Sequence, residues 1–170
     1  LLAAALTASQ TPGGYAPFAL GCVAACGPGP AGVAALLGAG VGAVLFLDFS
    51  AALPFLAAAV LIFTTAAAFQ GLRLLEGPLF HPLAGAGLFL AVSGIYVLQS
   101  LSPLHHLASC LAGTVLVGLS AWYYQPLLQG EQPRPEPDSL LFLAASVALA
   151  LGDAELAGLS LGRALLCLLL

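Results

Sequence analysis

Charged residues are scarce in this chain: three basic and seven acidic side chains make up only 6% of its 170 residues. A soluble domain has about a quarter of its residues charged, so this scarcity excludes an ordinary soluble protein. No charged residue precedes Asp48, and none lies between Glu76 and Glu131. Each of these two gaps is long enough for two membrane-crossing helices of about 20 residues. The sequence therefore predicts a multi-pass membrane protein.

Basic residues are too few to form a cluster, and the formal net charge is -4. Without a positive patch the chain has little with which to bind phosphate groups, so we expect no nucleic-acid partner and take the lipid bilayer as its surroundings. The apolar segments are continuous rather than alternating, which favours helices over a β-barrel. The predicted fold class is all-α, a polytopic transmembrane helical bundle of about six to seven apolar segments joined by short turns.

Cysteine thiols are potential metal ligands. The chain has four cysteines, all within apolar segments: Cys22, Cys26, Cys110 and Cys167. Cys22 and Cys26 would share one helix face, and His105 with His106 would complete a metal site only if the fold joined them. No second cysteine pair and no H-x-x-x-H spacing accompany them. Because cysteine usually packs as a small apolar side chain, we expect no metal and no other cofactor in this segment.

No pattern in the sequence indicates a catalytic site. An intramembrane serine protease needs a nucleophile and a base within hydrogen-bond reach, and Ser120 and Ser160 superficially offer the nucleophile. Every histidine precedes them in the sequence, whereas the rhomboid arrangement requires one in a later helix. No paired carboxylates indicate a metalloprotease. We expect no catalytic residue and no enzyme activity in this segment.

Proline, glycine and charge divide the chain into four parts. Residues 1–14 are interpreted as the tail of an upstream helix, and residues 15–128 as the core membrane helices. Residues 129–139 carry alternating prolines and charges and are predicted to be an extramembrane loop. Residues 140–170 are interpreted as the last two membrane segments, truncated, with apolar runs at 140–151 and 156–170.

Within the core, four apolar segments are expected to cross the bilayer: 31–47, 51–69, 83–100 and 104–124. Ser50 is predicted to cap the second of these, with Pro54 in its first turn. Residues 70–82 are predicted to be a loop or an interfacial segment. Ser102 and Pro103 signal the start of the last segment, which Trp122, Tyr123 and Tyr124 would end as an interfacial aromatic belt.

The few basic residues also set an expected orientation. Two intervening spans place the loops of Arg73 and Arg134 on one side of the membrane, and the positive-inside rule makes that side cytoplasmic. The turn at residues 27–30 is then expected on the same side. The turns at Asp48 and Asp153 are expected on the opposite side.

Glycines spaced by four residues are the strongest positive signal. Gly38 and Gly42 form one Gly-xxx-Gly pair, and Gly158 and Gly162 form another. Such pairs let two helices approach closely, within one chain or between two copies. We predict that Gly38 and Gly42 make the main close helix contact.

The Gly-Pro-Gly-Pro sequence at residues 27–30 leaves an alternative function open. Glycine and proline interruptions mark the broken helices of transporters, so a small transporter or channel-like membrane protein is the alternative. Ionisable groups of such sites lie within the bilayer, whereas the acidic residues here fall in predicted turns and loops. Arg163 is interpreted either as an intramembrane charge or as a snorkelling side chain near the interface.

A motif near the start of the chain leads to a family. Pro17 and Phe18 begin a short apolar segment, and Gly32, Gly38 and Gly42 follow it across a brief turn. With the Ala-rich helix that comes next, this order resembles the N-terminal membrane region of stage II sporulation protein E. In that family a Pro-Phe-Gly motif begins a short helix and the following helix is glycine-rich. The likeness covers residues 11–128.

The resemblance implies a role for the segment. It implies a multi-pass anchor in the bacterial cytoplasmic membrane that targets a sporulation-specific PP2C-type serine phosphatase to the division septum of a Firmicute. It also implies self-association and cell-division proteins as partners. The parent enzyme would use manganese or magnesium in a downstream domain. None of that domain's acidic motifs is present in this sequence, so the segment itself is expected to be non-catalytic.

Overall fold

The computed structural model describes residues 1–10, 15–70, 77, 79–99, 103–129, 137–152, 155–156 and 159–160. Over these residues the chain is helical apart from one pair of two-residue strands, which confirms the predicted helical class. The elements are α1 (Leu2–Leu6), α2 (Pro17–Cys26), α3 (Pro30–Phe46), α4 (Phe49–Ala68), α5 (Phe80–Gln99), α6 (Pro103–Gln129), α7 (Pro137–Ala150), β1 (Glu155–Leu156) and β2 (Leu159–Ser160).

Among the described residues, three helices are long and apolar enough to cross a membrane: Phe49–Ala68, Phe80–Leu98 and His106–Gln129. They belong to α4, α5 and α6. The helices α2, α3 and α7 are apolar but shorter. These lengths and compositions fit a membrane protein, with fewer full-length spans than the six to seven apolar segments predicted.

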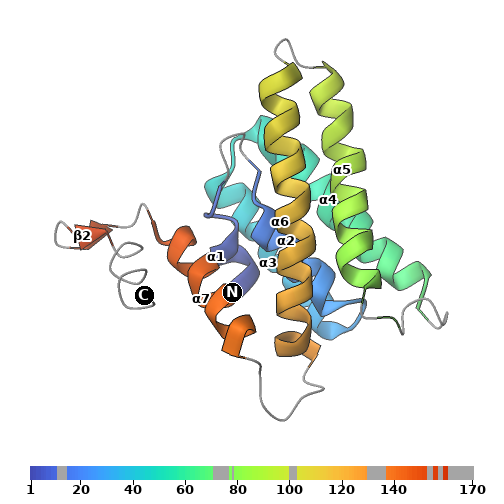
Figure 1. The fold of residues 1–170 in the computed structure, drawn as a ribbon, viewed down its shortest axis with the longest axis vertical. Coiled ribbons are helices and arrows are strands. Elements are labelled where there is room, and N and C mark those ends of the chain that lie inside the picture. Colours follow the sequence, from blue (N-terminus) through green and yellow to red (C-terminus); the bar gives the residue numbers. More distant parts are fainter. Residues whose placement is uncertain are drawn as a thin grey trace.

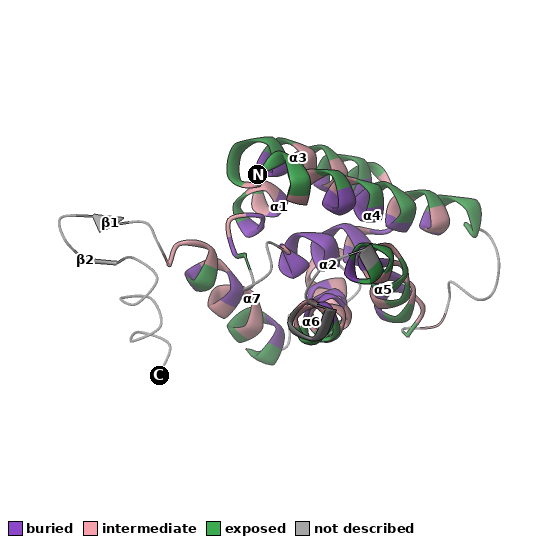
Figure 2. Ribbon diagram, turned by 90° about the horizontal axis from the view of Figure 1, so that it is seen from above, coloured by how far each residue is buried: buried purple, intermediate pink, exposed green. Residues whose placement is uncertain are grey.

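The helices form two layers around a central element. In Figure 2, α3 and α4 lie side by side on one side of α2, while α5 and α6 lie on the other. Figure 1 shows α5 and α6 running side by side along the long axis of the molecule, with α7 next to the lower part of α6. Nine of the ten residues of α2 are buried, so this apolar helix packs against other helices on every face.

Proline and glycine set several helix boundaries. Pro17, Pro30, Pro103 and Pro137 each stand at the first residue of a helix, where the missing amide hydrogen costs little. The start signal predicted at Ser102 and Pro103 is confirmed, and α6 begins one residue before the predicted Leu104. Gly27 ends α2 with φ at +65°, a conformation that a glycine adopts without strain. The break at residues 27–30 is thus a turn between two helices.

The start of α4 differs from the prediction. Asp48 occupies the N-cap position, and its carbonyl accepts hydrogen bonds from the amides of Ala51 (2.9 Å) and Ala52 (2.8 Å). Ser50 therefore lies inside the first turn and is not the cap. Since the helix begins earlier, Pro54 also lies past the first turn, where an amide would otherwise donate to the Ser50 carbonyl.

The end of α6 also differs from the prediction. The helix continues to Gln129 instead of ending at Tyr124. Tyr124 is fully buried, and its hydroxyl donates to Ser146 Oγ on α7. Phe142 of α7 stacks on the Tyr123 ring and meets the Tyr124 ring edge-on. The predicted aromatic belt is therefore wrong for Tyr124, because a partner on α7 satisfies its hydroxyl inside the protein.

Two predicted loops are shorter in the structure. His81 and Pro82 lie in the first turn of α5, which begins at Phe80, and not in a loop that extends to residue 82. Pro137 begins α7 inside the predicted loop 129–139, with Asp138 in the first turn, where a carboxylate is favourable. Residues 130–136 of that loop lie outside the described residues, as does Arg73.

Of the predicted membrane segment at 156–170, the structure describes only Leu156, Leu159 and Ser160. Glu155 pairs with Ser160 and Leu156 with Leu159 in an antiparallel ladder. The remaining residues of this segment, including Gly158, Gly162 and Arg163, lie outside the described part of the chain.

Candidate functional site

The half-length helix α2 occupies the middle of the bundle. It contacts α1, α3, α4, α5 and α6. Its ten residues rise about 15 Å, roughly half the thickness of a bilayer core. Its N-terminus lies beside Phe89 and Ser93 in the middle of α5, and its C-terminus lies beside His81 at the start of α5. Polar or reactive groups lie at both ends of α2.

Small residues allow α2 to approach α6 and α5 closely. A Cβ built on Gly21 would overlap the Ser120 side chain and would lie 3.0 Å from the backbone nitrogen of Ala121. On α5, a Cβ on Gly85 would lie 3.0 Å from Ala24 Cβ. Backbone approach of this kind is the usual way in which membrane helices gain packing energy.

Gly38 and Gly42 both face the N-terminal helix α1. A Cβ on Gly42 would overlap Thr7 Oγ1 and would lie 2.8 Å from the Ala4 carbonyl oxygen, whereas one on Gly38 would meet Ala3 Cβ at an ordinary 3.5 Å. Only Gly42 therefore requires the absence of a side chain. Within the chain, this predicted pair packs α3 against α1.

The other motif residues lie at the two ends of α2. Pro17 is its first residue, and Phe18 is buried with its ring 6.1 Å from that of Phe142. Gly32 lies in the first turn of α3, where a Cβ would overlap the Gly27 carbonyl. The compact turn from α2 to α3 therefore depends on both Gly27 and Gly32.

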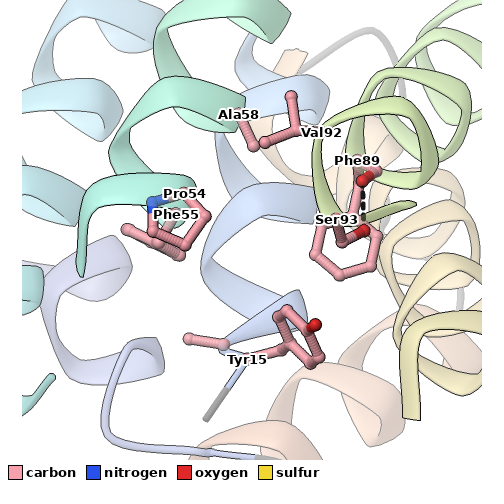
Figure 3. A pocket seen from close by; sticks show the side chains of 8 residues that line it. Tyr15, Pro54, Phe55, Ala58, Phe89, Val92 and Ser93 are labelled. Carbon is pink, nitrogen blue, oxygen red and sulfur yellow. Dashed lines mark hydrogen bonds between the residues drawn. The ribbon is translucent and has the colours of Figure 1, made fainter. Parts of the chain in front are cut away.

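A small cavity lies at the N-terminus of α2, between α4 and α5 (Figure 3). It is lined by Tyr15, Ala16, Pro54, Phe55, Ala58, Phe89, Val92 and Ser93. Its volume of about 10 Å³ is enough for one water molecule at most. The Ser93 hydroxyl donates to the Phe89 carbonyl, and the Cys110 thiol lies 3.2 Å from Ser93 Oγ. The cavity is thus mainly apolar, with a hydroxyl that is already bonded.

The C-terminal end of α2 carries a pair of thiols. Cys22 and Cys26 lie one turn apart on the same face of α2. Cys22 is only 2% exposed, while Cys26 is partly exposed. The Gln129 amide donates to the Ala25 carbonyl at 3.0 Å.

The turn at residues 27–30 was predicted to lie on the same side of the membrane as the loop before α5 and the loop after α6. A Cβ on Gly27 would lie 3.5 Å from His81 Cε1 and 4.0 Å from Gln129 Nε2. The turn at residues 27–30 therefore lies at the end of the bundle where α5 begins and α6 ends, as predicted from the span count. The side of the membrane to which this end belongs stays a prediction.

The residues that the sequence offered as metal ligands or as a catalytic serine are not arranged as such sites in the described part of the structure. Among the described side chains, no three His, Cys, Asp or Glu residues are close enough to hold a metal ion. The side chain of His105 lies outside that set. The Ser120 hydroxyl donates to the carbonyls of Leu116 (2.6 Å) and Val117 (3.1 Å), so its hydrogen bonds stay within α6. The reactive groups that the fold does bring together are the thiols of Cys22 and Cys26.

Some of these contacts were missed from the sequence. Gly21 has no glycine four residues away, so no spacing rule singled out its contact with Ser120. Tyr124 was assigned to the interface although Ser146, a hydroxyl in an apolar helix, was an available partner. A serine in such a helix needs an acceptor nearby, and this is the signal that could have found Ser93 and Ser146.

The comparisons add no relative. Protein families, curated proteins and solved structures were compared with the chain, and none matches it.

Proposed function

We propose that this chain is a non-catalytic, multi-pass membrane region that anchors a sporulation-specific PP2C-type serine phosphatase and targets it to the division septum. The observation that carries the anchoring role is the filled centre of the bundle, where α2 has nine of its ten residues buried. A packed centre suits a region that holds another part in position. Manganese or magnesium belongs to the phosphatase domain of the proposed parent.

The proposed parent protein, a phosphatase that resembles stage II sporulation protein E, is inferred from the motif that begins at Pro17. A short helix begins at Pro17, and the helix after it contains Gly32, Gly38 and Gly42. This is the order that the resemblance to stage II sporulation protein E implies. The proposed partners are the lipid bilayer, further copies of the chain and cell-division proteins at the septum of a sporulating Firmicute.

The proposed membrane arrangement uses all six apolar helices from α2 to α7. With 17 residues, α3 is about 25 Å long, at the lower limit for a spanning helix. Its outer face exposes Leu37 (66%), Val44 (78%) and Leu45 (67%), which lipid would cover. In this arrangement α3, α4, α5 and α6 each cross the membrane, while α2 reaches halfway and α7 packs against α6.

Localisation in cells tests the anchoring proposal. We would fuse the whole chain to a fluorescent protein and express the fusion in a sporulating Firmicute. A septal band of fluorescence is the expected result. Uniform fluorescence around the whole membrane would contradict the targeting role, and cytoplasmic fluorescence would contradict membrane anchoring.

The cavity at the N-terminus of α2 favours a second candidate, a small transporter. Half-length helices that begin near the middle of the bilayer are typical of transporter substrate sites, and Tyr15 and Ser93 line the cavity there (Figure 3). At about 10 Å³ the cavity holds no solute, so α2 would have to move to open a path. Solute uptake by liposomes that contain the purified chain, above that of protein-free liposomes, would favour this candidate over the anchor.

A further inference from the structure

The thiols of Cys22 and Cys26 differ in their access to solvent. Both side chains lie on one face of α2, one helical turn apart. Cys26 is the last residue of α2 and is partly exposed, whereas Cys22 lies one turn deeper and is 2% exposed. One thiol is therefore available to a reagent, and the other is held behind it.

The position of the pair gives Cys26 access to water. The turn after Cys26 lies beside His81 in the first turn of α5 and beside Gln129, the last residue of α6. These are the ends of two helices that are long enough to cross a bilayer. Cys26 is consequently near the membrane surface and not at the middle of the hydrocarbon core.

The end of α2 can change shape to close the pair. Side chains four residues apart on a helix have Cβ atoms about 5–6 Å apart, while a disulfide needs about 3.5–4.5 Å. The last turn must therefore open slightly for a bond to form. Gly27 allows this, since its backbone is already outside the helical region at φ +65° and its amide makes only a long 3.4 Å hydrogen bond to Ala24.

We propose that Cys26 and Cys22 form a reactive dithiol site, in which Cys26 attacks a low-molecular-weight disulfide and Cys22 resolves the product. The Cys26 thiolate forms a bond to one sulfur of the disulfide and releases the other half as a thiol. Cys22 then loses its proton, bonds to Cys26 Sγ and releases the second half as a thiol. The protein dithiol is oxidised to a disulfide, and the small disulfide is reduced to two thiols, which is the usual course of such exchange.

Cys110 provides an internal comparison. It is fully buried in α6 and its thiol contacts Ser93 Oγ at 3.2 Å. Because its thiol is buried and contacts a serine hydroxyl, it should stay unreacted while the protein is folded. Cys167 lies outside the described residues and is replaced by serine in every variant of the test.

The test uses the full chain with Cys167→Ser, purified in detergent and treated with glutathione disulfide. After the reaction is stopped, free thiols are alkylated under unfolding conditions and the intact mass and peptide masses are measured. We expect loss of two hydrogen atoms, a Cys22–Cys26 disulfide, no glutathione adduct and alkylation at Cys110. Cys22→Ala should leave a stable glutathione adduct on Cys26, and Cys26→Ala should leave Cys22 free.

Other outcomes would overturn the proposal. A stable adduct on Cys26 with Cys22 intact would show that Cys22 does not resolve. A glutathione adduct on Cys22 in the Cys26→Ala variant would show that the buried thiol can react first. A reaction with glutathione disulfide no faster at Cys26 than at Cys110 would show that exposure does not decide which cysteine reacts first. Cys22→Ser serves as a second resolving-thiol variant if Cys22→Ala fails to fold, and helical content by circular dichroism confirms folding in each case.

Discussion

The hydroxyl of Tyr124 on α6 donates a hydrogen bond to Ser146 Oγ on α7 at 2.5 Å, with both side chains buried. Ser146 in turn donates to the Leu143 carbonyl at 2.8 Å. The bond therefore links α7 to the rest of the bundle through a chain of satisfied polar groups. Its removal should affect the docking of α7 in particular.

Tyr124→Phe should lower the free energy of unfolding by about 1 kcal/mol, the typical net value of one hydrogen bond. The ring is kept, so the contact with Phe142 remains. Tyr123→Phe is the matched control, because the stacking of Tyr123 on Phe142 involves only its ring. Denaturation of the detergent-solubilised protein measures the free energy of unfolding of both variants. An equal loss of stability in the two would contradict a stabilising hydrogen bond from Tyr124 to Ser146.

Gly42→Ala should destabilise the fold by about 1–3 kcal/mol, the usual cost of overpacking. The added methyl would meet the Ala4 carbonyl on α1 and Oγ1 of Thr7, the C-cap residue of that helix. Gly87→Ala is the control, because no atom lies within 4 Å of its built Cβ. That substitution should stabilise the helix by about 0.5–1 kcal/mol through the propensity difference alone.

The Gly38 and Gly42 positions are also predicted to differ from each other. A methyl on Gly38 meets Ala3 Cβ at 3.5 Å, an ordinary contact, so Gly38→Ala should be nearly neutral. If Gly38→Ala and Gly42→Ala prove equally harmful in the same denaturation assay, the pair packs on another helix or on a second copy of the chain.

Gly21→Ala should separate α2 from α6, because the new methyl would overlap the Ser120 side chain. Ser120→Gly in the same protein should restore part of the lost stability, since it removes both the hydroxyl and the Cβ. Ser120→Ala should restore little, because Ser120 Cβ is itself 2.6 Å from the built atom. A double-mutant cycle measures this coupling. Additive effects of the two substitutions would contradict the contact.

The sequence predicted the long helices well because their signal is local. The absence of charge between Glu76 and Glu131 is enough to predict α5 and α6, and Pro103 marks where α6 begins. The positions of Tyr124 and Gly21 could not be predicted in the same way. An aromatic side chain near a helix end has one sequence pattern whether it faces lipid or another helix, and only the arrangement of α7 decides between them.

The same limit applies to the candidate site. The spacing of Cys22 and Cys26 indicated a shared helix face, but not that one thiol would be buried and the other partly exposed. Gly42 was predicted as a close contact, whereas its partner α1 was not, because nothing in the spacing of glycines names the opposing helix. Such contacts depend on the rotation of each helix and on the order of helices in space.

Membrane topology is the most direct test of the multi-pass arrangement. Single cysteines at Gly29, Asp48, Gln70 and Gln129, in a chain without its native thiols, would be labelled in intact cells with a reagent that does not cross membranes. The account predicts that Gly29, Gln70 and Gln129 are protected together and that Asp48 alone is labelled, or the reverse if the orientation is inverted. Labelling of Asp48 together with Gln70 would show that α4 does not cross the membrane and would contradict the account.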